Sequence, residues 1–357
     1  MGTLRTLFAI AVVCAHSYGY VFVGGRNAVQ LFYMISGFLI SYVLVEKKAY
    51  ATVANFYINR YLRLYPIYFV VGLLSFLVLR PAGFFEVYRT APAAADVLLI
   101  FSNITLIAQD WVMFSGVESN KLVFSTDFQK SEVVLQAGLL LPQAWTLGVE
   151  LTFYLIAPFV LERKKIIFLL LLLSIAIRVY VLQIGLGRND PWTYRFFPTE
   201  LALFLFGALA HQVLLPFYRK YFSGERMEVV ARNSTYFLVL VTLVYWLIPI
   251  YELIKAPVFF LLFLFFMPFI FVFQSTRSWD KWVGDLSYPI YICHLLAIHV
   301  VTLILAKLGA ADKISIAFLA VIFSIVFSMA LNSFVANPVE VLRSRFRAGT
   351  KLASPQF

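Results

Sequence analysis

Charged residues are scarce in this sequence. Asp, Glu, Lys and Arg together make up 13% of its 357 residues, whereas a typical soluble domain carries about 25%. Such a chain cannot cover its surface with polar groups, so a soluble globular protein is excluded. Disorder requires low hydrophobicity, and 62% of these residues are hydrophobic, so a disordered chain is excluded as well.

Cysteine and histidine are also rare. The two cysteines, Cys14 and Cys293, both lie in apolar segments, so we expect neither a disulfide framework nor a thiolate metal site. The four histidines show no ligand spacing such as His-x3-His. The sequence therefore gives no reason to expect a metal.

Basic residues exceed acidic ones, with a net charge of +11. On a soluble chain this excess would suggest nucleic acid. Here the basic residues form short clusters between apolar segments, as the positive-inside rule of membrane proteins requires. We expect no nucleic-acid partner and expect contacts with membrane lipids.

What the chain has in abundance is apolar runs of bilayer length. A helix needs about 20 residues to cross the hydrocarbon core. That length predicts an all-α polytopic membrane bundle of about ten transmembrane helices, and a single domain over 1–340 followed by a basic cytoplasmic tail at 341–357. The expected spans are 4–23, 28–45, 64–80, 139–161, 166–184, 197–215, 235–251, 257–274, 283–306 and 314–336.

A further apolar segment, 95–109, is short and contains Asn103 and Thr105. If this segment does not cross and the N-terminus is cytoplasmic, most of the 29 Lys and Arg residues fall on the cytoplasmic side. If it crosses, the bias reverses and contradicts the positive-inside rule. We therefore expect a re-entrant or interfacial segment on the outer side, and both termini in the cytoplasm.

Ionisable groups at membrane depth are functional candidates, because burying them there costs several kcal/mol. Arg5 and His16 are eleven residues apart, which places them on one helix face about 16 Å apart along the axis. A neutral imidazole in the membrane can accept a proton from a hydroxyl. The competing interpretation is a packing histidine that is hydrogen-bonded to a neighbouring helix.

A second candidate cluster lies in the stretch from Phe56 to Pro66. Arg60 and Arg63 are three residues apart and share a helix face, so that two guanidiniums could hold phosphate groups at the cytoplasmic side. Topology anchoring with lipid headgroup contact is the competing interpretation.

Buried carboxylates and cations elsewhere need partners. Glu150 lies midway along its expected span and could orient His16, bind substrate or pair with an arginine. Arg178 and Glu200 could form a structural pair. His211 and His299 do not lie in any recognisable motif, and we expect structural roles for both.

Five stretches together resemble acyltransferase family 3. They are Leu4–Arg5 to His16, Gln30 to Leu39, the Arg60–Arg63 pair, Trp145 to Tyr154, and Ser287 to His294. This family consists of integral-membrane enzymes that modify cell-surface carbohydrates and other extracytoplasmic acceptors. The resemblance implies a plasma (bacterial inner) membrane location and an acyl-CoA donor, with acetyl-CoA the commonest.

The resemblance also implies roles for residues, with two departures. Many members carry a second acidic residue where this chain has Leu151, and Trp where it has Cys293, which makes His294 a weaker candidate than His16. The resulting site has catalytic residues His16, Arg5 and Glu150, and donor-binding residues Arg60, Arg63 and Tyr65. The weaker candidates for substrate contact are Ser36, Trp145, Arg195, Glu200, Tyr288 and His294.

We therefore expect a membrane O-acyltransferase that uses His16 as general base or as transient acyl carrier. The acceptor is expected to be a carbohydrate or glycolipid, and cell-envelope polysaccharide assembly proteins are candidate partners. The alternative is a glycolipid or polysaccharide carrier or flippase, which should show inverted repeats with matching broken helices. The sequence shows no such pairing.

Overall fold

Long apolar helices dominate the computed structural model, which describes residues 1–79, 82–310 and 312–347. Eight helices in these described ranges are long and apolar enough to cross a membrane. They run over Gly25–Glu46, Val53–Leu79, Lys164–Gln183, Phe197–Tyr221, Gly224–Leu247, Glu252–Ser275, Ser278–Lys307 and Lys313–Ser344. The predicted polytopic helical bundle is confirmed.

The chain divides into two units, which are described separately. Unit 1 comprises residues 1–42 and 203–332, and unit 2 comprises 43–202 and 333–357, of which 348–357 lie outside the described residues. The helix α8 (Phe197–Leu209) belongs to both. The expected tail boundary at 340/341 falls inside the helix α15 (Asn337–Ser344).

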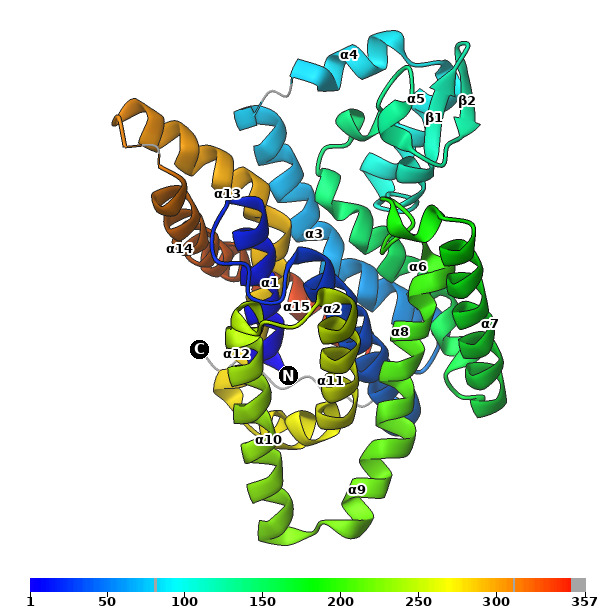
Figure 1. Ribbon diagram of the computed structural model, residues 1–357, viewed down its shortest axis with the longest axis vertical. Helices are drawn as coiled ribbons and strands as arrows, with labels where there is room; N and C mark the ends of the chain where they lie inside the picture. Colours follow the sequence, from blue (N-terminus) through cyan, green and yellow to red (C-terminus); the bar gives the residue numbers. More distant parts are fainter. Residues whose placement is uncertain (80–81, 311, 348–357) are drawn as a thin grey trace. The chain divides into compact units, whose positions relative to one another are not determined.

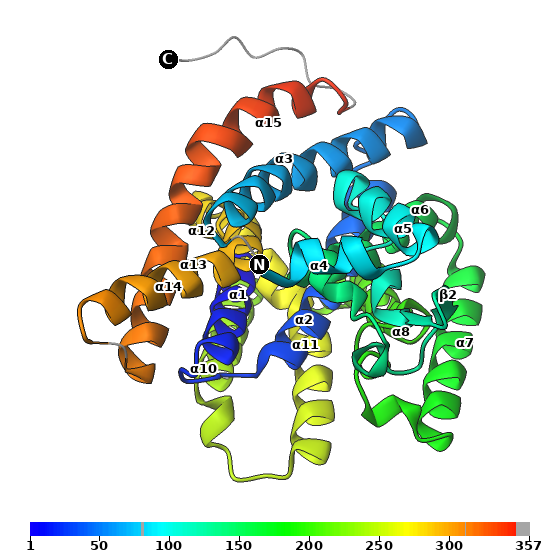
Figure 2. The same ribbon diagram turned by 90° about the horizontal axis from the view of Figure 1, so that it is seen from above.

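Unit 1 is built around α1 (Gly2–His16), which packs against α2, α12, α13 and α14. Figure 1 shows α13 beside α14, and Figure 2 shows α10 beside α11, as the contacts between these helices also indicate. The other elements of unit 1 are α2 (Gly25–Ser41), α9 (Leu215–Tyr221), α10 (Gly224–Val244), α11 (Glu252–Ser275), α12 (Ser278–Asp285), α13 (Ser287–Lys307) and α14 (Lys313–Leu331).

Two glycines allow α2 and α8 to cross at backbone contact. A Cβ on Gly37 would lie 1.9 Å from the carbonyl oxygen of Phe204, and one on Gly207 would lie 1.9 Å from that of Met34. Small residues at such crossings let membrane helices approach closely, so that dispersion contacts hold them together.

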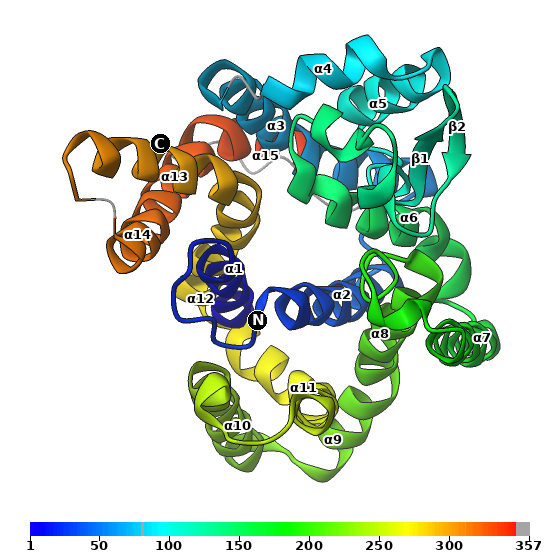
Figure 3. The same ribbon diagram turned by 45° about the horizontal axis from the view of Figure 1, so that its top comes forward.

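Unit 2 carries the remaining elements, with α15 lying alongside α3 (Figure 2) and a β-hairpin next to α5 (Figure 3). They are α3 (Val53–Leu79), α4 (Ala82–Thr90), α5 (Ala93–Thr105), β1 (Ser115–Glu118), β2 (Lys121–Phe124), α6 (Trp145–Val160), α7 (Lys164–Gln183) and α15. The hairpin pairs Ser115 with Phe124 and turns at Ser119 and Asn120, both with positive φ, as tight hairpin turns require.

In three of the expected apolar segments, the helix is shorter than the length needed to cross the hydrocarbon core. The helix α5, within the expected interfacial segment, has 13 residues and a length of about 20 Å, below the roughly 30 Å of a hydrocarbon core. The helix α6 has 16 residues instead of the expected span 139–161, because Pro142 starts a 3₁₀ turn ahead of it.

The expected span 4–23 also ends early, at His16. Tyr18 adopts a left-handed conformation with φ 62°, and the Gly19 amide donates to the Cys14 carbonyl at 3.1 Å. This is the reversal that closes a helix C-terminus. His16 therefore lies at the end of a helix rather than midway along one.

Candidate active site

The helix that carries Arg5 and His16 is anchored at its beginning. The Asp280 carboxylate accepts hydrogen bonds from the amides of Gly2 and Thr3, at 2.7 and 2.8 Å, and from the Thr3 hydroxyl at 2.7 Å. A carboxylate at this position satisfies unpaired amides and complements the helix dipole. Its effect is to fix α1 against α12, and hence the position of the other end of α1.

At that other end, His16 meets His294 of α13. Their ring centroids are 4.8 Å apart and their planes are inclined by 53°. His16 is exposed, whereas His294 is completely buried. The structure thus brings together the strongest histidine candidate from the sequence and one of the weaker ones.

Both imidazoles are oriented by carbonyl groups of their own helices. His16 Nδ1 lies 2.9 Å from the Val12 carbonyl oxygen, and His294 Nδ1 bonds the Tyr291 carbonyl. Because a carbonyl oxygen only accepts, each neutral ring carries its proton on Nδ1 and a lone pair on Nε2. Within the described chain, the buried Nε2 of His294 has no hydrogen-bond partner.

Leaving a buried acceptor unsatisfied costs about 1–3 kcal/mol, and such groups in folded proteins call for an explanation. A donor that arrives with a substrate, such as a hydroxyl group, would satisfy it. The pair is therefore equipped to bind and deprotonate a hydroxyl.

Unit 2 contains the second group of candidates. Arg60 is 8% exposed, and its guanidinium lies 5.7 Å from the ring centroid of Phe56 and 5.9 Å from that of Tyr154. Arg63 is half-buried, and among the described residues it has no hydrogen-bond or ion-pair partner. Tyr65 stacks on Tyr61 at 4.9 Å. A buried and a half-buried cation, one turn apart, can attract an anion.

Glu150 belongs to this group in unit 2. The Tyr154 hydroxyl donates to Glu150, and the charges of Arg60 and Arg63 act on the same tyrosine. The Val12 carbonyl fixes the tautomer of His16, which is one of the roles that the sequence left open to Glu150. A main-chain carbonyl four residues back can do this in any helix, so the sequence gives no sign of it.

Two further arginines in unit 2 have carboxylate partners. Arg178 donates to Glu200 at 2.7 Å, so these two residues form the ion pair that the sequence allowed. Arg195 binds Asp190 through two hydrogen bonds, at 2.6 and 2.9 Å, and its guanidinium lies 4.4 Å from the ring centroid of Trp145. Arg195 is thus held in one orientation against an aromatic ring.

Besides His294, two weaker candidates lie in unit 1. Ser36 is half-buried on α2, and Tyr288 is half-buried on α13, six residues before His294. His211, expected to be structural, lies 2.9 Å from the Ser41 hydroxyl within a buried aromatic environment.

Sequence reasoning missed Asp110, a buried carboxyl beside α6. A Cβ on Gly148 would lie 2.4 Å from Asp110 Oδ1, so that only glycine fits there. Burial raises the pKa of Asp110 to about 7. The sequence signal was weak, because an aspartate in a polar loop is usually solvated.

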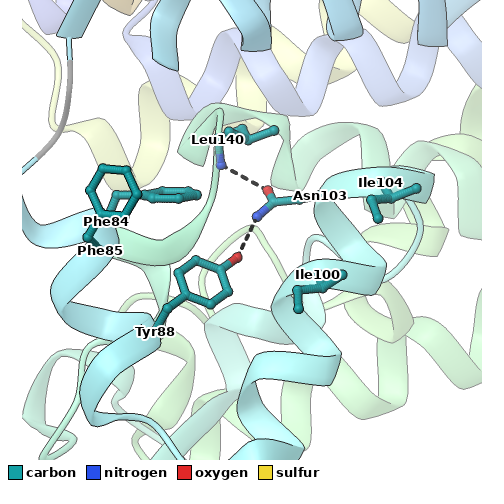
Figure 4. A pocket seen from close by; sticks show the side chains of 7 residues that line it. All are labelled: Phe84, Phe85, Tyr88, Ile100, Asn103, Ile104 and Leu140. Carbon is teal, nitrogen blue, oxygen red and sulfur yellow. Dashed lines mark hydrogen bonds between the residues drawn. The ribbon is translucent and has the colours of Figure 1, made fainter. Parts of the chain in front are cut away.

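A cavity of about 320 Å³ in unit 2 is lined by apolar and aromatic side chains from α4 and α5, together with Leu140 (Figure 4). Its Asn103 accepts from the Leu140 amide at 2.9 Å and donates to the Tyr88 hydroxyl at 3.1 Å, so its amide holds the wall together. None of the lining residues is charged, and the cavity offers no base for acyl transfer. No cluster of metal-ligating residues occurs in the described ranges.

Comparison with known proteins identifies the family of this chain. The family model described as an acyltransferase domain, that of acyltransferase family 3, matches residues 2–333. An uncharacterized protein of Aquifex aeolicus (strain VF5) is 26% identical over 215 residues, which cover 57% of this chain and 89% of that protein. No solved structure matches. The chain therefore belongs to acyltransferase family 3 and is a multi-pass membrane acyltransferase.

Proposed function

We propose that this acyltransferase moves an acyl group, most simply acetyl, from acyl-CoA to a hydroxyl of a carbohydrate or glycolipid on the outer side of the plasma membrane. The observation that supports this proposal most strongly is the His16–His294 pair, whose Nε2 lone pairs suit a hydroxyl nucleophile. Family membership favours acyl transfer over the alternative of a carrier or flippase.

The proposed reaction uses His16 as general base. The acceptor oxygen attacks the thioester carbonyl carbon, so that a C–O bond forms and the C–S bond breaks. The hydroxyl proton passes to His16 Nε2, and the departing thiolate of coenzyme A receives it afterwards. His294 Nε2 then accepts a hydrogen bond from the protonated ring of His16 and stabilises it.

A variant of this route has the same overall balance. His16 Nε2 attacks the thioester first, and the acylated imidazole then passes its acyl group to the acceptor. Rapid quenching with radiolabelled acetyl-CoA in the absence of acceptor distinguishes the two routes, because only the second leaves label on the protein.

Arg60 and Arg63 are proposed to bind the phosphate groups of the donor, since guanidinium forks match phosphate geometry. Glu150 and Tyr154 lie in the same cluster and would hold the orientation of Arg60. Arg5 and Tyr65 are proposed as further donor contacts. Trp145 with Arg195, and Ser36 with Tyr288, remain candidates for acceptor contact.

The test is release of coenzyme A by the purified protein in nanodiscs, with acetyl-CoA and a panel of surface glycans. We expect release that depends on acceptor, and its loss in His16→Ala and His294→Gln. His299→Ala is the matched control, because His299 lies exposed on the same helix as His294. Activity in both pair variants at the control level would refute the proposal.

A further inference from the structure

The helix α15 lies outside the residues that the family model matches, which end at 333. It packs along α3, the helix that carries Arg60 and Arg63 (Figure 2). We infer that α15 is part of the donor site: Arg343 positions Arg60, and the two helices together form one cluster of arginines that binds phosphate groups. This inference rests on the proposed function.

Arg343 of α15 and Asn59 of α3 are joined by hydrogen bonds in both directions, and we call this set of hydrogen bonds the clasp. Arg343 donates from Nε to the Asn59 carbonyl at 3.2 Å and from Nη2 to Asn59 Oδ1 at 3.3 Å. In return, Asn59 Nδ2 donates to the Arg343 carbonyl at 2.8 Å. Asn59 is fully buried and precedes Arg60 in the chain, so the clasp holds the backbone from which the Arg60 side chain projects.

The clasp continues to the Arg60 guanidinium through one tyrosine. The Tyr50 hydroxyl donates to Asn59 Oδ1 at 3.0 Å and accepts from Arg60 Nη2 at 3.2 Å. Arg343, Asn59, Tyr50 and Arg60 thus form one hydrogen-bonded chain. Its Arg60 end is buried and leaves Nε without a hydrogen-bond partner in the described part of the chain.

Positive charge is concentrated here. The charges of Arg60, Arg63 and Arg347 all act on Arg343. Glu340 pairs with both Arg343 and Arg347, but Arg63 has no ion-pair partner among the described residues. Four guanidiniums around one paired carboxylate attract anions, and guanidinium forks favour phosphate.

The cluster can be tested through the donor KM. Tyr50→Phe removes a single hydroxyl and detaches Arg60 from the clasp, whereas Arg343→Ala removes the two hydrogen bonds that the Arg343 side chain donates to Asn59. We expect each to raise the KM for acetyl-CoA by about tenfold, as loss of a hydrogen bond to a charged group does, with kcat within about threefold. Arg343→Lys should recover part of the loss, and the exposed Arg345→Ala should behave as wild type.

A structural role alone would lower kcat and thermal stability without this selective effect on KM. Unchanged KM in both Tyr50→Phe and Arg343→Ala would overturn the inference while acyl transfer by the wild-type protein stands. If the wild type turns over no acyl-CoA, the proposed function fails. Binding of inorganic pyrophosphate that is lost in Arg343→Ala would then still support the arginine cluster.

The phosphate could belong to a soluble donor or to a lipid headgroup. Titrations with coenzyme A in nanodiscs of neutral phosphatidylcholine, and in nanodiscs that also contain phosphatidylglycerol, separate these sources. We expect the effect of Arg343→Ala on coenzyme A affinity to be present in neutral nanodiscs. If Arg343→Ala alters only stabilisation by phosphatidylglycerol, the cluster binds lipid and the inference is wrong.

Discussion

His294 turns its fully buried ring toward His16, with 4.8 Å between the ring centroids. The two rings come from α1 and α13, at opposite ends of the sequence, and each is oriented by a carbonyl of its own helix. Two groups that take part in one proton transfer should behave as a unit.

The first prediction concerns that coupling. Substitution of either histidine should lower kcat/KM by about 10²–10⁴-fold, the range for loss of general base catalysis. The double variant His16→Ala/His294→Gln should be no worse than the more severe single variant, because groups that act together are not additive. Multiplicative losses in the double variant would mean that the two rings act independently.

The second prediction concerns Arg60 and Arg63. Arg60→Ala and Arg63→Ala should each raise the donor KM by about tenfold, and should make it less sensitive to salt, because an ion contact is lost. Initial rates at varied acetyl-CoA and ionic strength provide the measurement. Lys164→Ala, an exposed cation in the same unit, is the control, and an equal effect there would contradict a specific site.

The third prediction uses the pKa of Asp110, which burial raises to about 7 from an ordinary value near 3.9. Between about pH 4 and pH 7 the folded state holds a proton that the unfolded state has lost. Stability should therefore fall as pH rises through this window, by at most about 4 kcal/mol, and level off above pH 7.

Melting temperatures of wild type and Asp110→Asn between pH 5 and pH 8 measure this effect. Asp110→Asn should flatten the profile, whereas Glu118→Gln, in the exposed hairpin, should keep the wild-type slope. A wild-type profile that rises from pH 5 to pH 7, with no change in Asp110→Asn, would contradict the prediction.

The fourth prediction concerns the crossing of α2 and α8. Gly37→Val places atoms where the Phe204 carbonyl lies, so we expect destabilisation by about 1–3 kcal/mol or more. Gly72→Ala, where the nearest atom to a new Cβ is 3.8 Å away, should leave the melting temperature within a few degrees. Equal stability of both variants would mean that α2 and α8 do not cross so closely.

The fifth prediction addresses orientation and the short helix α5. Ile104 is 60% exposed on α5, and we expect it to lie in hydrocarbon, where a thiol stays protonated and unreactive. A membrane-impermeant maleimide applied from outside should label Lys121→Cys quickly and Ile104→Cys slowly. Arg226→Cys should be labelled only after permeabilisation, and rapid labelling of intact cells there would reverse the proposed topology.

The membrane fold was predictable because hydropathy alone identifies long apolar helices. The ends of helices were less predictable. A residue in the left-handed conformation ends α1, and this residue is Tyr18 rather than the glycine that usually marks a helix end in a sequence. The end of α1 at His16 was therefore missed. The β-hairpin was missed because its strands have four residues each.

Candidate site residues could be proposed from the sequence where residue type alone indicates the chemistry. Arg5, His16, Arg60 and Glu150 stand out as ionisable groups in apolar surroundings. The residues that contact them in the folded protein cannot be identified in this way, because contacts such as that of Arg343 with Asn59 join distant segments of the sequence. Asp190, the partner of Arg195, lies five residues away but outside any regular helix.

The orientation of both histidines by main-chain carbonyls has a consequence for how such a site tolerates substitutions during evolution. No side-chain substitution can remove an acceptor that belongs to the peptide backbone. The proton of each ring therefore stays on Nδ1 when neighbouring residues are substituted. The orientation of the two rings therefore does not depend on any carboxylate side chain. Replacing the main-chain amide with an ester weakens the carbonyl as an acceptor, and this is the change that would weaken its hydrogen bond to the imidazole.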